Sequence, residues 1–284
     1  MLDIWVCSSC HSVNRERATS CYKCGAPRAA ATGEGGGRRE SRAIMARIAS
    51  PYRSTVELAV LAGLFLLIFV GVELWSTVWE AGWVPRVQAL LDGVAAGGGF
   101  DQPAWDAVVN AQDPLAIPTL AAYLIATIAF GGWLSLSVAN IPALGGGEPK
   151  VSPIRAFASS VIPFYNLRKV PAIVQEVLYR VDPRRGGVFM VGLAFIGLAG
   201  SWLVGRILGL YIDTRIATEA FNATSAADYA TRVKPLVDLA FAVDVLVSGL
   251  IALGAVMLVV IMIEAERRAA ARNREIEAEL ASVG

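Results

Sequence analysis

The chain has 284 residues, of which 55% are apolar and 17% are charged, and its formal net charge is +1. Such a composition is too apolar for an ordinary soluble domain of this length, and the balanced charge excludes a bulk attraction to nucleic acid. We therefore expect a membrane protein.

The first feature along the chain is a cysteine cluster at the amino end. Its four members form two Cys-x-x-Cys pairs: Cys7, Cys10, Cys21 and Cys24. Two such pairs can place four thiolates around one Zn²⁺ ion, whereas disulfides would require an oxidising compartment. The sequence predicts one structural zinc ion in a finger that covers residues 1–28.

Trp5 and Asn14, at their spacing from the cysteines, complete a pattern that resembles the Ran-binding-protein-type zinc finger over residues 3–28. The resemblance implies two crossed β-hairpins that share the metal. Relatives bind either single-stranded RNA or ubiquitin. The RNA-binding pattern has an aromatic residue directly after the Asn, where this chain has Arg15, and loss of such a stacking ring weakens base binding.

A cytosolic protein partner is therefore favoured over RNA for this finger. The ubiquitin-binding pattern is absent too, because His11-Ser12 stands where those relatives have Thr-Phe. The candidate contact surface consists of Val13, Asn14, Arg15 and Arg17. A purely structural role for the zinc is the alternative.

Residues 29–53 are rich in Gly, Ala and Arg and predict a flexible basic linker. Four apolar runs follow within residues 54–263, and each is long enough to cross a hydrocarbon core of about 30 Å. They cover residues 56–79, 116–139, 188–212 and 236–263. The expected fold is thus an all-α membrane helical bundle of four transmembrane helices plus interfacial helices, with a zinc-bound β-hairpin finger in front.

The basic residues predict the orientation, because cytoplasmic segments hold Lys and Arg in excess. The linker, the loop of residues 140–187 and the tail of residues 264–284 are rich in Arg, whereas residues 80–115 hold one Arg against five acids. Both termini should therefore be cytoplasmic. In the tail, Glu264 and Arg268 have the i,i+4 spacing of a helical ion pair, and a solvated helix is expected there.

The loop of residues 140–187 is more than a linker. Residues 154–165 are apolar but too short to span, and we expect them in the membrane interface. After Pro171, which suits a first helical turn, apolar residues from Ile173 to Val181 fall on one stripe. This pattern predicts an amphipathic helix at the membrane surface.

Three charges lie inside the predicted spans at similar depth, namely Glu73, Arg206 and Asp244. An intramembrane charge is a functional candidate by default. A structural ion-pair cluster is the favoured interpretation, and a small transporter or channel with a polar cavity is the alternative. The third span also carries small residues every four positions from Gly197 to Gly209, which favours tight helix packing or, less so, a homo-oligomer seam.

The stretches from Trp133 to Pro142 and from Val161 to Leu178 resemble a bacterial multi-pass family of unknown function. The resemblance implies a location in the bacterial plasma membrane and brings no activity. No His lies in any span, so a Ser-His pair is excluded there. We expect a non-enzymatic regulatory or scaffold protein that contacts the lipid bilayer.

Overall fold

The computed structural model describes residues 4–6, 13–15, 18–21, 27, 51–109, 116–162, 165–183 and 189–283. Its elements are, in chain order, β1 (Ile4–Val6), β2 (Val13–Arg15), α2 (Val56–Ala95), α3 (Gln102–Val109), α4 (Ala116–Asn140), α5 (Pro153–Val161), α6 (Tyr165–Val181), α7 (Met190–Phe195), the π-helical segment η1 (Ile196–Gly200), α8 (Ser201–Asn222) and α9 (Ala226–Val283).

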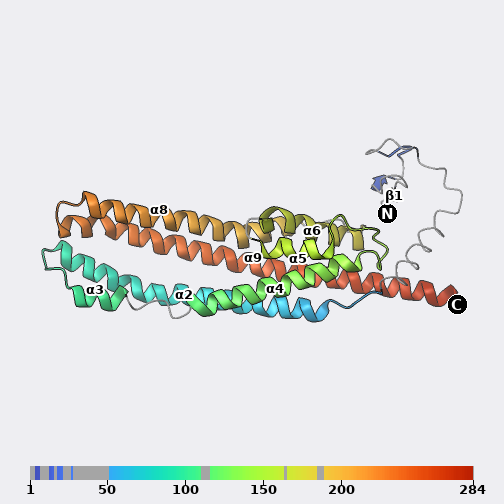
Figure 1. Ribbon diagram of the computed structural model, residues 1–284, viewed down its shortest axis with the longest axis horizontal. Helices are drawn as coiled ribbons and strands as arrows, with labels where there is room; N and C mark the ends of the chain where they lie inside the picture. The colour runs from blue at the N-terminus through green and yellow to red at the C-terminus, as the bar shows by residue number, and fades with distance from the viewer. Residues whose placement is uncertain are drawn as a thin grey trace.

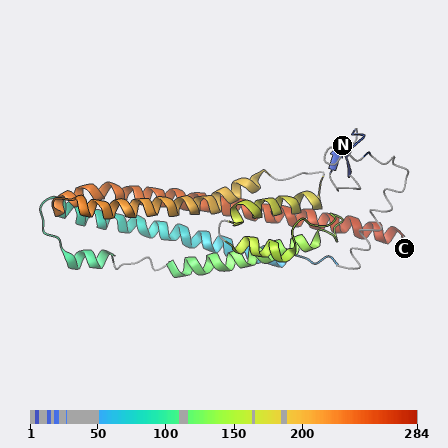
Figure 2. The same cartoon turned by 45° about the horizontal axis from the view of Figure 1, so that its top comes forward.

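The helices form an elongated bundle in which α9 packs against both α2 and α8, and α4 packs against α2 (Figures 1 and 2). Among the described residues, four helices are long and apolar enough to cross a membrane. Three of them are α2, α4 and α9. The fourth is a continuous rod made of α7, η1 and α8. α2, α4 and α9 each contain one predicted run in full, and the rod begins at Met190, two residues after the start of the predicted run 188–212.

Three of these helices extend well beyond the predicted spans. α2 has 40 residues and α9 has 58, so at about 1.5 Å per residue they are about 60 and 87 Å long. We call the end where α2 leads to α3 and α8 turns into α9 the hairpin end. There α2 and α9 bury an apolar cluster that includes Val87, Leu91 and Val233, and α3 covers it with Trp105.

Helix caps, and not loss of hydropathy, fix the bounds at the hairpin end. Gly97 has a φ of +84°, and the Gly98 N–H donates to the Gly93 carbonyl, which is the Schellman arrangement that ends α2. The Ser225 hydroxyl accepts from the Asp228 N–H at 3.1 Å, and the Asp228 carboxylate accepts from the Thr224 N–H at 2.9 Å. This reciprocal cap starts α9 ten residues before its predicted span.

At the other end, which we call the terminal end, α5 and α6 pack on the bundle beside both α4 and α9 (Figure 1). The α6 stripe exists as predicted, but it is buried inside the protein: Val170, Val174 and Leu178 are 0% exposed. The stripe therefore packs against protein and not against lipid, and the expected position of α6 at the membrane surface stays a prediction. α6 also begins at Tyr165, so Pro171 lies inside the helix.

Near the amino end, β1 pairs antiparallel with β2, with Trp5 opposite Asn14. An isolated bridge joins Ser20 to Pro27. Cys21 is described and is 2% exposed, whereas Cys7, Cys10 and Cys24 lie outside the described residues. The zinc site and the hairpin finger therefore stay predictions.

Candidate functional site

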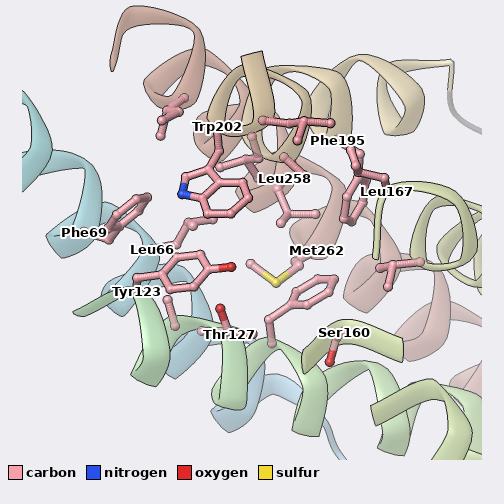
Figure 3. Close-up of a pocket in the computed structure, with 18 residues that line it drawn as sticks. Leu66, Phe69, Tyr123, Thr127, Ser160, Leu167, Phe195, Trp202, Leu258 and Met262 are labelled. Carbon is pink, nitrogen blue, oxygen red and sulfur yellow. The ribbon is translucent and has the colours of Figure 1, made fainter. Parts of the chain in front are cut away.

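A cavity of about 200 Å³ lies between the long apolar helices (Figure 3). Its walls come from α2, α4, α5, α6, α9 and the rod of α7, η1 and α8. The lining side chains are Ala62, Leu66, Phe69, Tyr123, Ala126, Thr127, Phe130, Ser160, Leu167, Val170, Phe195, Leu198, Ala199, Trp202, Leu203, Ile251, Leu258 and Met262.

The lining is almost entirely apolar. Its hydroxyl groups belong to Tyr123, Thr127 and Ser160, and Figure 3 shows the first two with their oxygens directed into the hollow. The Ser160 hydroxyl donates to the Phe157 carbonyl at 2.6 Å, so it is satisfied within α5. Such a site can hold an apolar body and offer it one or two hydrogen bonds.

The π-helical segment η1 forms part of the wall through Leu198 and Ala199. It lies where the rod crosses α9 at two glycines. A Cβ at Gly254 would lie 2.6 Å from the Leu198 backbone nitrogen, and one at Gly197 would lie 2.9 Å from the Gly254 Cα atom. The glycines therefore permit a backbone contact that no larger residue allows, and the close packing predicted from the small-residue stripe is confirmed at Gly197. At Gly209 a Cβ would meet nothing within 4 Å.

The cavity covers the half of the apolar zone that is nearest the terminal end. On α9 it extends from Ile251 to Met262, which is about 16 Å at helical rise. Met262 stands just before Glu264, where the apolar run of α9 ends. Since a hydrocarbon core is about 30 Å thick, this depth corresponds to one leaflet.

Beside the cavity, a polar cluster joins three segments at the terminal end. The Glu266 Oε1 atom accepts from Trp133 Nε1 at 2.8 Å and from the Thr55 hydroxyl at 2.6 Å. The Asn140 side chain holds the Arg53 backbone, accepting from its N–H at 3.1 Å and donating to its carbonyl at 2.7 Å. We call these five residues the clasp; it ties the segment before α2 to α4 and α9.

The clasp contains an unusual carboxylate. The Glu266 Oε2 atom is buried and has no hydrogen-bond partner in the structure, and it borders a void of about 10 Å³ next to Ser137 and Asn140. That volume is about the smallest that accepts one water molecule. Burial, and then the negative charge of Glu266, raise the pKa of the nearby Tyr52.

The three predicted intramembrane charges lie on α2, α8 and α9 near one level. The Thr77 hydroxyl, one turn beyond Glu73, lies 3.2 Å from the Asp244 carboxylate and 3.0 Å from the Ser248 hydroxyl. The Arg206 guanidinium lies over the Trp202 ring at 5.7 Å from its centre. Pairing among the three charges stays a prediction, and none of them lines the cavity.

The predicted finger surface is described only in part. Val13, Asn14 and Arg15 form β2, and Arg17 lies outside the described residues. Nothing in the described backbone tests whether this surface contacts a partner. In the tail, the predicted ion pair is confirmed, since Arg268 Nε lies 2.8 Å from Glu264 Oε1. Arg268 is buried beneath α6, not solvated as expected.

Sequence reasoning missed the cavity and Glu266. A single carboxylate in a charged tail carries no signal of burial, although Trp133 and Asn140 lay in the stretch that supplied the family resemblance. Comparisons with family models, with curated proteins and with solved structures give no match for this chain. Both family resemblances stay predictions.

Proposed function

We propose that this chain is a non-enzymatic multi-pass membrane protein that binds one lipid chain, or an apolar molecule of similar width, between its helices. The cavity carries this proposal. Its wall is built from six parts of the chain, and it is apolar apart from three hydroxyl groups and the Trp202 indole N–H. Apolar cavities of about 150 Å³ stay dry and take up apolar molecules such as benzene, and this one is larger.

The surroundings of the cavity favour a ligand that comes from the bilayer. Tyr123 and Trp202 line it and are also 39% and 41% exposed, so the cavity reaches the lipid-facing surface of the bundle. Its depth of one leaflet suits a single acyl or isoprenoid chain. A water-soluble substrate would have no polar route through these walls.

The partner-recruiting role remains part of the proposal. With both termini in the cytosol, as the arginine distribution favours, a finger with one structural zinc would belong to the cytosolic side of the membrane. The clasp holds the segment before α2, which follows the finger and the linker in the chain, against α4 and α9. These two helices also line the cavity. Ligand occupancy would thereby alter how the amino-terminal region is held for a protein partner.

A small transporter or channel that uses Glu73, Arg206 and Asp244 is the alternative, supported by the contact of Asp244 with Thr77, whose hydroxyl also contacts Ser248. An ion path would need a polar cavity beside these residues. The observed cavity is apolar and does not include them, so it favours a ligand site.

Photo-crosslinking tests the proposal. A phospholipid with a diazirine in one acyl chain should label residues of α4 between Tyr123 and Phe130 when the whole protein is in nanodiscs. Ala126→Phe fills the cavity and should remove this labelling, whereas Ala121→Phe, on an exposed position of the same helix, should keep it. Equal labelling in the two variants, with both still folded by thermal melting, would overturn the ligand site.

A further inference from the structure

The α5–α6 unit enters the apolar zone and returns to the terminal end. A Cβ at Gly131 of α4 would lie 2.4 Å from the Ser160 hydroxyl and 3.1 Å from the Phe157 ring. Gly131 is about 13 Å from the end of α4 at Asn140, at helical rise. The turn after α5 therefore lies beside α4, about 13 Å short of the end of that helix, and next to the cavity.

Apolar side chains on this turn are exposed. Val161 is 42% exposed and Ile162 is 50% exposed. Exposed aliphatic residues on a short helical unit are typical of a segment that sits in the acyl region of one leaflet. Lipid from this leaflet therefore reaches the protein surface beside the cavity.

Two basic side chains lie in the first turns of α6, shortly after this turn. Arg168 and Lys169 are exposed and lie between Leu167 and Val170, which both line the cavity. Figure 3 places Leu167 and Ser160 on one side of the hollow and Phe69 and Tyr123 on the opposite side. Arg168 and Lys169 therefore lie at the end of the cavity that is nearer Glu264, where the apolar run of α9 ends.

The stretch from α5 to the first half of α6 carries basic charge only, whereas Glu176 in the second half of α6 is paired with Arg180. Residues 151–175 contain Arg155, Arg168 and Lys169 and no Asp or Glu. Long basic side chains bury their stems along apolar surface while they carry the charged group to the headgroup region. A lipid phosphate bound by Arg168 and Lys169 would lie on the headgroup side of an acyl chain that enters the cavity beside Leu167.

We propose that the ligand of the cavity is an anionic phospholipid of the leaflet at the terminal end, with one acyl chain in the cavity and its phosphate at Arg168 and Lys169. This inference rests on the proposed function and adds the headgroup. A basic residue near an anionic headgroup strengthens binding about fivefold, so removal of both side chains weakens it by about 25-fold at most.

The test compares two lipids that carry the same diazirine chain, phosphatidylglycerol and phosphatidylcholine, at trace level in phosphatidylcholine nanodiscs with the full chain. The expected result is severalfold stronger labelling of cavity residues by phosphatidylglycerol. R168Q/K169Q should abolish the preference while phosphatidylcholine labelling persists, which shows that the variant is folded. R155Q is the matched control, because Arg155 is an exposed base at the start of α5 whose chain neighbours do not line the cavity, unlike those of Arg168 and Lys169, and it should keep the preference.

The outcomes separate the two proposals. Equal labelling by the two lipids in the unmodified protein, or a preference that survives in R168Q/K169Q, overturns the headgroup inference and leaves the apolar site intact. Absence of cavity labelling by either lipid overturns the proposed function itself. Loss of the preference in excess inorganic phosphate would show a site for free phosphate and would likewise overturn the lipid headgroup inference.

Discussion

Removal of the Trp133 indole nitrogen should destabilise the terminal end through the clasp. Trp133 is 0% exposed, and its Nε1 atom donates to the Glu266 carboxylate at 2.8 Å. A hydrogen bond to a charged group contributes about 1.5–3 kcal/mol net, and the smaller ring of Phe adds about 1 kcal/mol of lost packing. Trp133→Phe should therefore lower the free energy of unfolding by about 2.5–4 kcal/mol.

A double-mutant cycle in detergent, with unfolding followed by circular dichroism, isolates the contact. Glu266→Met removes the acceptor, and the combination with Trp133→Phe should show a coupling of about 1.5–3 kcal/mol. Trp83→Phe is the matched control, because Trp83 donates to the neutral Val108 carbonyl at 2.8 Å at the hairpin end. It should cost less and show no coupling to Glu266. Additive losses for Trp133 and Glu266 would refute the clasp.

Three further predictions concern the helix crossing, the metal and the orientation. Gly254→Ala should cost about 1–3 kcal/mol in a detergent unfolding assay because its Cβ meets backbone atoms, whereas Gly249→Ala, with nothing within 4 Å, should be neutral or stabilising; equal effects would contradict the close crossing. Cys21→Ser should abolish zinc binding without releasing the chain from the membrane, and metal analysis that finds no zinc in the unmodified protein would exclude the finger. An Asn222→Cys variant should react with an impermeant thiol reagent from outside intact cells and a Glu277→Cys variant should not; the reverse pattern would invert the topology.

The positions of the membrane helices could be predicted from sequence, but their ends could not. Hydropathy reports where the chain leaves the hydrocarbon core, and Trp79 marks that point on α2. The helix continues because the following residues keep a helical apolar period and pack on α9 until Gly97. The helix caps beyond the apolar run thus set the lengths of these helices, and a hydropathy window along the sequence does not detect them.

The candidate site, too, could be predicted from the sequence only in part. The period of the α6 stripe was readable, but periodicity does not say whether lipid or protein covers an apolar face, and here α9 and its neighbours do. A cavity forms where side chains from distant parts of the chain fail to fill space. No pattern along α4 predicts that Thr127 faces a hollow or that Glu266, in a charged tail, lies against Trp133.

The most direct test of the central claim is the amount of lipid that the purified protein retains. Native mass spectrometry after extensive delipidation should show one bound lipid per chain for the unmodified protein, and for Ala121→Phe as well. Ala126→Phe should show none, because the new ring occupies the cavity. A lipid retained equally by all three proteins, or by none of them, would contradict a lipid-binding site between these helices.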